Sequence, residues 1–234
     1  LNESHIADWR DRRLKEVQAG TVLREWNLLS AIFSKCVKEW RWLKSNPMTN
    51  VLRPPEPVPR TRRPTPEEIE ALLIVTGYEE NVPPDSKTKR VGAAMLFAIA
   101  TAMRAGEICG LTWDNVNFED NTAFLPTTKN GSSRTVPLSK KAVSILKDLE
   151  GVEECQANCF GMITSTLDAM FRKSKVKANI EDLHFHDMRR EALTRMSKKV
   201  EVLPLAKISG HKDLKLLLNV YYSPEMSEYS SLLD

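Results

Sequence analysis

Apolar residues recur at helical spacing in the first part of the chain. Between Thr21 and Leu43 they fall on one face of a helix, and a second helix is predicted across Ile6 to Val17. Thr21 follows Gly20 and is a residue type that caps helix N-termini, so we expect the longer helix to begin there. Its apolar face comprises Val22, Trp26, Leu29, Phe33, Val37 and Trp40. The front of the chain is therefore predicted to be a small helical unit.

Two further helices are predicted from residue 65 onward. Thr65-Pro66-Glu67-Glu68 combines a capping residue, a proline at the first helical position and acids in the first turn, and the helix is expected to run to about Val75. Val91 to Met103 is apolar on nearly all sides, which is typical of a helix buried in a core. Its apolar run is shorter than the roughly 20 residues that span a bilayer.

A small sheet is predicted in the middle of the chain. The segments Asn121 to Pro126 and Ser133 to Leu138 flank Asn130-Gly131, a dipeptide that favours a tight hairpin turn. Two antiparallel strands are therefore expected there.

The rest of the chain has helical spacing again. Ser139 is placed to cap a helix from Lys140 to Leu149. From Thr164 onward the pattern is helical, and breaks are expected near Pro204, Gly210 and Pro224. The predicted fold class is mostly α with a small antiparallel β-sheet (α+β).

Prolines separate the front unit from the rest. Six of the 13 prolines lie between Pro54 and Pro66, interleaved with arginines, and such a stretch is extended and semi-rigid. We therefore divide the chain into a helical part (1–57), a linker (58–66) and a larger part (67–234).

The composition changes this picture mainly through the distribution of charge. The net charge of +3 divides into +6 over residues 1–66, from 13 basic and seven acidic residues, and −3 over the remainder. A basic front favours a polyanionic partner, although a solvated helix face would give the same count.

An apolar fraction of 41% excludes wholesale disorder, and four cysteines exclude a disulfide-stapled miniprotein. The simplest setting for these thiols is a reduced, cytoplasmic one.

Candidate chemistry begins at Arg104, directly after the buried apolar run. An unpaired guanidinium there would be costly, and Glu107 lies one helical turn away. The two residues form either a structural ion pair or an arginine held in place to bind a phosphate or carboxylate. Lys129 lies at the hairpin tip, where a lone lysine is usually just solvated.

Histidines supply the second group of candidates. His186 and Arg189 are three residues apart and can face one site, while Asp187 is expected to cap their helix. A metal site at His184 and His186 is weakly supported, because no second His or Cys pair lies at ligand spacing. We therefore assign no metal.

His211, Tyr221 and Tyr222 complete a set of arginines, lysine, histidines and tyrosine. Arginines and imidazoles bind the non-bridging oxygens of a phosphodiester, a phenol is a nucleophile and a lysine is a proton donor. Such chemistry needs no metal or nucleotide, and the sequence has no phosphate-cradling glycine loop.

The order of these residues resembles the tyrosine recombinase (phage integrase) family. The resemblance is carried by five segments over about 120 residues, and their order makes it specific although each is weak alone. The segments are 102–113 around Arg104, 127–138 around Lys129, 183–189 around His186 and Arg189, 208–214 around His211, and Tyr221-Tyr222-Ser-Pro224.

The resemblance implies roles for each residue. Arg104 and Arg189 would clamp the scissile phosphate, while His186 and His211 hydrogen-bond it. Lys129 would protonate the 5′-oxygen leaving group, with Glu107 supporting Arg104. The DNA-binding residues expected outside this set are Arg53, Arg60, Arg62, Arg63 and Arg134.

The resemblance also implies an organisation and partners. Residues 1–57 would be the later part of a helical core-binding domain that begins further upstream, and residues 67–234 the catalytic domain with a short tail. The implied activity is site-specific recombination in a phage or other mobile element of a prokaryote, through a 3′-phosphotyrosyl intermediate and a Holliday junction. The partner would be double-stranded DNA at a specific site. The protein would be a monomer when free and a homotetramer on synapsed DNA, with no cofactor and no membrane association.

Two departures from the family leave alternatives open. Arg190 stands where a second histidine is common, and Val220 stands at the usual position of the nucleophile, nine residues after His211. The Tyr-Tyr-x-Pro context assigns the nucleophile to Tyr221, with Tyr222 as its rival. The competing functions are a type IB topoisomerase-like enzyme, a catalytically silent DNA-binding relative and a metal-dependent nuclease.

Overall fold

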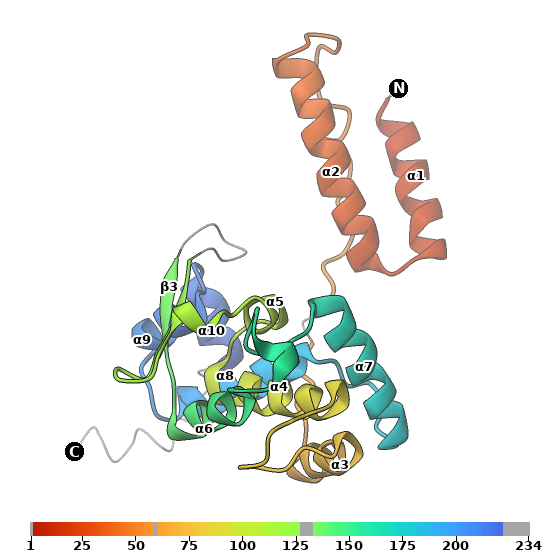
Figure 1. Cartoon of the computed structure of the whole chain (residues 1–234). Helices are drawn as coiled ribbons and strands as arrows, with labels where there is room; N and C mark the ends of the chain where they lie inside the picture. Colours follow the sequence, from red (N-terminus) through yellow and green to blue (C-terminus); the bar gives the residue numbers. More distant parts are fainter. Residues whose placement is uncertain (1, 59, 127–132, 222–234) are drawn as a thin grey trace, which may run out of the picture. The chain divides into compact units, whose positions relative to one another are not determined.

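The computed structural model describes residues 2–58, 60–126 and 133–221, apart from the side chains of residues 216 and 219–221. It divides the chain into two compact units, Leu1–Thr61 and Arg62–Asp234 (Figure 1). The boundary falls inside the proline-rich stretch.

The first unit contains two helices that lie side by side, α1 (Glu3–Glu16) and α2 (Ala19–Lys38) (Figure 1). Ile6, Trp26 and Met48 form their small buried core. The predicted cap at Thr21 is wrong, because its backbone N–H donates to the carbonyl of Gln18, the actual N-cap residue. A hydrogen bond inside the first turn thus replaces the side-chain cap.

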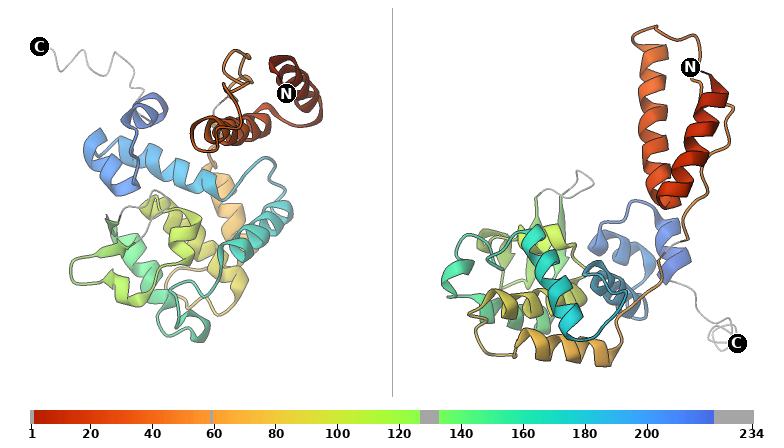
Figure 2. Two further views of the ribbon diagram at one scale, coloured as in Figure 1. Left: turned by 90° about the horizontal axis from the view of Figure 1, so that it is seen from above. Right: turned by 90° about the vertical axis from the view of Figure 1, so that its right-hand side faces the viewer.

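The second unit is built mainly of helices around one long core helix. Helix α4 packs against α3, α6, α7 and α8, and most of its residues are buried, as its all-round apolar pattern predicted (Figures 1 and 2). The elements are α3 (Pro66–Thr76), α4 (Lys87–Thr101), α5 (Ala105–Cys109), α6 (Lys140–Leu149), α7 (Thr164–Lys177), α8 (His186–Ser197), α9 (Val202–Ser209), α10 (Leu214–Tyr221), and 3-10 turns at Trp113–Asn115 and Glu153–Cys155.

Two helix starts follow their capping residues as predicted. The Thr65 hydroxyl accepts the backbone N–H of Glu68 at 3.2 Å, and the Glu68 carboxylate accepts the backbone N–H of Thr65 at 2.8 Å. The Ser139 hydroxyl likewise accepts the backbone N–H of Ala142 at the start of α6. In both cases a side chain satisfies an N–H group that the helix itself cannot.

A three-stranded antiparallel sheet, in the order β1-β2-β3, lies between α5 and α6 in the chain. Strands β2 (Thr122–Leu125) and β3 (Arg134–Pro137) are the predicted pair, with Leu125 opposite Arg134. Strand β1 (Val116–Asn117) was not predicted, because a two-residue strand carries no alternating pattern. The tip between β2 and β3 includes Lys129 and lies outside the described residues.

The last helices form one group beside the sheet, in which α9 packs against β3, α8 and α10 (Figure 2). The predicted break near Pro204 falls earlier, because Pro204 occupies the first turn of α9, where no N–H is needed. Gly210 ends α9 as predicted, with a φ of +70° that favours glycine. Within the described ranges, no helix is both long and apolar enough to cross a membrane.

Candidate active site

Arg189 is the most deeply buried candidate, at 3% exposure, and comes from the first turns of α8. Its Nη1 donates to the carbonyl oxygen of Ala102, and its Nη2 to that of Ser209 at 2.7 Å. Ala102 ends α4 with a φ of +56°, which is uncommon for a residue with a side chain. The Arg189 guanidinium therefore joins the end of α4 to the end of α9.

Arg104 lies in the turn between α4 and α5, and not on the buried helix that the apolar run predicted. Its backbone N–H and its Nη1 each donate to the Glu107 carboxylate at 2.8 Å. The side chain is 20% exposed, and within the described part of the chain its Nε and Nη2 make no hydrogen bond. Arg104 is thus held through its backbone N–H and one of its three guanidinium nitrogens.

The Glu107 carboxylate also accepts hydrogen bonds from a second arginine, Arg134. Nη1 of Arg134 donates to Oε1 at 2.9 Å, and Nη2 donates to Oε2 at 2.7 Å. Burial would raise the pKa of Glu107, but the hydrogen bonds and charges of Arg134 and Arg104 lower it to about 2. The carboxylate is therefore ionised throughout the neutral pH range.

Arg134, which we interpreted from the sequence as a DNA contact, lies inside the unit. Its side chain is 8% exposed, and besides Glu107 its Nε donates to the carbonyl of Ile208 at 2.9 Å. A Cβ at Gly210 would come within 2.9 Å of its Nη1, so a larger residue there would collide with the guanidinium. No local sequence pattern signals the contact with Glu107, because the two residues are 27 positions apart.

The two histidines lie within the field of these arginines. Burial, followed by the positive charges of Arg189 and Arg104, lowers the pKa of His211 to about 4. His186 is exposed, but the part of its ring that faces the site is desolvated, and this desolvation and the charge of Arg189 also lower its pKa. Both imidazoles are therefore neutral at physiological pH in the free protein.

Ser209 is a contact that sequence reasoning missed. Its hydroxyl lies 2.7 Å from Nδ1 of His211 and 2.6 Å from the carbonyl oxygen of Leu205. A serine two residues before a candidate histidine was the available hint.

The structure thus brings Arg104, Glu107, Arg134, His186, Arg189 and His211 together at the ends of α4 and α9, the start of α8 and strand β3. Lys129 and Tyr222 lie outside the described residues. Tyr221 ends the backbone of α10, but its side chain lies outside the described part. The expected Asp187 cap is wrong, because Asp187 lies within α8, where its carboxylate accepts the backbone N–H of His184.

The four arginines in and just before the linker that we expected to bind DNA each make an interaction within the chain. Arg62 pairs with Glu68, and Arg63 lies 3.6 Å from Glu191 on α8, so both belong to the second unit. On the first unit, Arg53 donates to the side chain of Asn27 at 2.9 Å. Arg60 also makes an interaction within the chain.

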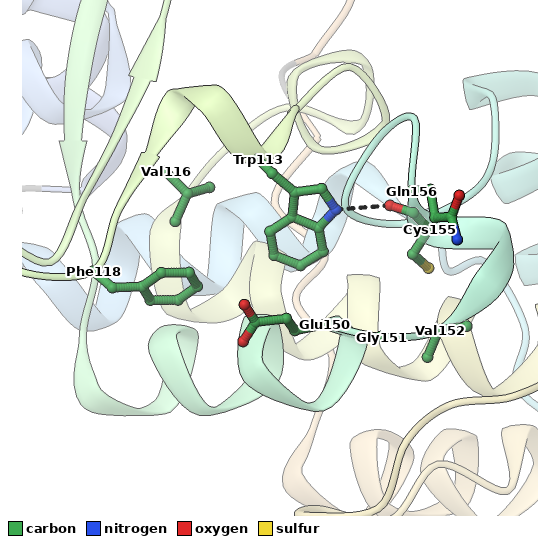
Figure 3. Close-up of a pocket in the computed structure, with 8 residues that line it drawn as sticks. All are labelled: Trp113, Val116, Phe118, Glu150, Gly151, Val152, Cys155 and Gln156. Atoms are coloured by element: carbon green, nitrogen blue, oxygen red, sulfur yellow. Dashed lines mark hydrogen bonds between the residues drawn. The ribbon is translucent and has the colours of Figure 1, made fainter.

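Two cavities differ in their relation to this site. One of about 450 Å³ is lined mainly by apolar side chains such as Trp113 and Phe118, with Trp113 donating to the carbonyl of Cys155, and it contains none of the candidate residues (Figure 3). Another of about 420 Å³ is lined by Arg134, Lys207 and His211 among others. Among the described residues, no group of three or more His, Cys, Asp or Glu side chains is arranged to hold a metal ion.

Known proteins resemble this chain in both sequence and fold. An integrase/recombinase of Haemophilus influenzae is 51% identical over 235 residues, which cover 100% of this chain and 76% of the relative. The Tn1549 transposon integrase in complex with circular intermediate DNA matches with a TM-score of 0.75 at 18% identity, covering 100% of this chain and 85% of that one. A lambda integrase tetramer bound to a Holliday junction matches with a TM-score of 0.71 at 17% identity, covering 91% and 65%.

The family itself follows from a match to a family model. The model described as the phage integrase family matches residues 62–228, which is more than half of the chain and includes every candidate residue of the second unit named above. Together with the relative that is 51% identical, this match shows that the chain belongs to the phage integrase family, the tyrosine recombinases.

Proposed function

We propose that this protein cleaves and rejoins DNA at a specific site through a covalent 3′-phosphotyrosyl intermediate, without metal or ATP. The observation that carries the proposal is the arrangement of Arg104 and Arg189 around two neutral histidines, with the Glu107 carboxylate turned to support Arg104. This arrangement suits a phosphodiester, which carries one negative charge and has two non-bridging oxygens.

The arginines would bind the scissile phosphate. Arg189 is fixed by two backbone carbonyls, and Arg104 is fixed by Glu107, so neither has to be ordered when DNA arrives. Preorganised donors of this kind stabilise the charge that develops on the phosphoryl oxygens in the transition state. His186 and His211 would add hydrogen bonds to the same oxygens, His211 after it has taken up a proton on DNA binding.

The nucleophile would be Tyr221. The backbone of α10 ends at this residue, and consecutive residues on a helix point about 100° apart, so only one of Tyr221 and Tyr222 would face the arginines. The phenol would release its proton to water, and its oxygen would bond to phosphorus while the bond from phosphorus to the 5′-oxygen breaks. Lys129 would give its proton to that oxygen. The tyrosyl ester conserves the bond energy, so the reverse attack by another 5′-hydroxyl rejoins strands without ATP.

Double-stranded DNA is the proposed partner, with a homotetramer on synapsed sites that passes through a Holliday junction. The support is the family, the basic charge of residues 1–66, and a fold like that of a lambda integrase tetramer on such a junction. Residues 1–57 would act as a core-binding domain, 58–66 as the linker and 67–234 as the catalytic domain. Arg53 and Arg60 would contact the DNA backbone.

The test is to denature the full-length protein rapidly in its host, recover the DNA that stays covalently attached, and sequence it. The proposal expects adducts concentrated at one or a few recurring sites, and unchanged adduct yield when a chelator is present. Adducts scattered over the genome would favour a topoisomerase-like enzyme. Absence of adducts would favour a catalytically silent DNA-binding relative, and loss of cleavage with the chelator would favour a metal-dependent nuclease.

A further inference from the structure

We propose that Arg134 is a positioning residue that leaves Arg104 free to bind the phosphate, because Arg134 neutralises the charge of Glu107. The inference rests on the proposed function and concerns a residue that does not itself touch the DNA. It replaces our sequence-based interpretation of Arg134 as a DNA contact.

The geometry assigns Glu107 mainly to Arg134. Both carboxylate oxygens accept from the two terminal nitrogens of Arg134, at 2.9 and 2.7 Å, in a parallel, bidentate pair. Arg104 gives the same carboxylate only one of its guanidinium nitrogens, Nη1, together with its backbone N–H. The side chains of Arg134 and Glu107 are 8% and 7% exposed, compared with 20% for Arg104.

The charges of the three side chains explain why this matters. Arg104, Glu107 and Arg134 sum to +1, whereas Arg104 and Glu107 alone sum to zero. Without Arg134, the buried Glu107 carboxylate would need another cation to neutralise its charge. Arg104 is the cation that is already in contact with it. Arg104 would then close onto Glu107, and the site would lose one positive charge without losing any group that contacts the phosphate.

Arg134 also joins three segments of the site. It lies on β3, five residues after Lys129 in the chain, and it binds Glu107 of α5 and the carbonyl of Ile208 on α9. Gly210 packs against the guanidinium with no room for a Cβ, directly before His211. Arg134 therefore links strand β3 to the turn that carries Arg104, between α4 and α5, and to the turn that carries His211, after α9.

A lysine could not replace this arginine. The single nitrogen of an ammonium group cannot bind both carboxylate oxygens in parallel and reach the carbonyl of Ile208 at the same time. Arg134→Lys would keep the charge and lose the geometry, which makes it a useful intermediate variant.

The experiment compares four proteins: wild type, Arg134→Gln, Glu107→Gln and the double variant. Each is given a nicked duplex carrying a recovered site, and the dissociation constant and the single-turnover rate of adduct formation are measured. We expect Arg134→Gln to lower the rate by about 100-fold while DNA affinity changes by less than about threefold. The double variant is expected to be at least about tenfold faster than Arg134→Gln, because the neutral amide that replaces the Glu107 carboxylate no longer captures Arg104.

The matched control is Arg172→Gln, which removes an exposed arginine that pairs with Asp168 on the outside of α7. Its rate and affinity are expected to match those of the wild type. Should Arg134→Gln fold poorly, as judged by its thermal midpoint, the same comparison is made with Arg134→Lys and its double variant with Glu107→Gln. A double variant no faster than the corresponding single variant, or equal losses of affinity and rate, would overturn the role of Arg134.

A second readout does not depend on cleavage. Inorganic phosphate is titrated into each protein while the NMR signal of the Arg104 guanidinium is followed. The wild type and the double variant are expected to bind phosphate at least about tenfold more tightly than Arg134→Gln. Equal phosphate affinity in all of them would contradict the inference, whereas a wild type that binds phosphate but forms no adduct would contradict only the proposed function.

Discussion

The Ser209 hydroxyl lies 2.7 Å from Nδ1 of His211, so the two groups share a hydrogen bond that bears on the tautomer of the ring. We assign the hydrogen of the hydroxyl to the carbonyl of Leu205, which lies 2.6 Å away, so that the hydroxyl oxygen accepts from His211. Nδ1 therefore carries the hydrogen in the neutral ring, and Nε2 has a lone pair. His211 can donate to a phosphate oxygen through Nε2 only after it has gained a second proton.

Proton uptake on DNA binding follows from this arrangement. In the free protein the pKa of His211 is about 4, so the ring is neutral at pH 6.5, and a bound phosphate favours the charged form. We expect the binding of a site duplex at pH 6.5 to take up as much as about one proton per protein. Calorimetry in buffers of different ionisation enthalpy measures this number. Binding with no net proton uptake would contradict the assigned tautomer.

Replacing Ser209 with Ala removes the acceptor that holds Nδ1–H. The other tautomer, with its hydrogen on Nε2, then becomes accessible, and proton uptake on binding is expected to fall. Nitrogen-15 chemical shifts of His211 report the tautomer directly. The control is Ser197→Ala, which removes a hydroxyl bonded to the carbonyl of Thr194 on α8 without touching a histidine. Identical ring shifts in wild type and Ser209→Ala would show that Ser209 does not set the tautomer.

Glu107 makes stability depend on pH in an acid window. Its pKa is about 2 in the folded protein, below the ordinary value of 4.5, so its stabilising contribution is present above pH 4.5 and is lost as the pH falls toward 2. Within that window each pH unit removes up to about 1.4 kcal/mol. Urea unfolding at pH 5 and pH 3 is expected to show a smaller difference for Glu107→Gln than for the wild type. An equal difference would mean that the carboxylate is not stabilised as the structure indicates.

Arg189 and Arg104 are expected to differ in their effect on stability. Arg189→Met leaves the carbonyls of Ala102 and Ser209 without a buried donor, which costs on the order of 2 kcal/mol or more in the free energy of unfolding. Arg104→Met removes a more exposed side chain, and Glu107 keeps Arg134. Both variants are expected to abolish adduct formation, but the thermal midpoint of Arg189→Met is expected to fall several degrees further. The reverse order of midpoints would contradict the assigned packing.

Local chemistry made parts of the fold predictable from the sequence. The capping box at Thr65, the cap at Ser139 and the stop at Gly210 each depend on residues within a few positions of one another. Buried helix α4 was equally clear, because its apolar residues face every direction. The order of the candidate residues along the chain was sufficient to recognise the family.

The contacts that shape the site could not be read in the same way. The pair of Arg134 and Glu107 joins residues 27 apart, and the contact of Arg134 with Ile208 joins residues 74 apart, so no local pattern records them. An arginine near a hairpin tip in a DNA-binding protein is more readily interpreted as a DNA contact. Only the fold shows that its charge faces a buried carboxylate.

The central claim is tested most directly by identifying the covalent bond. The wild-type protein is trapped on a nicked duplex, digested with protease and nuclease, and the modified peptide is sequenced by mass spectrometry. We predict a nucleotide joined through its 3′-phosphate to Tyr221, a free 5′-hydroxyl on the departing strand, and no adduct from Tyr221→Phe while Tyr222→Phe still forms one. An adduct on Tyr222, a link through a 5′-phosphate, or no adduct at all would contradict the account.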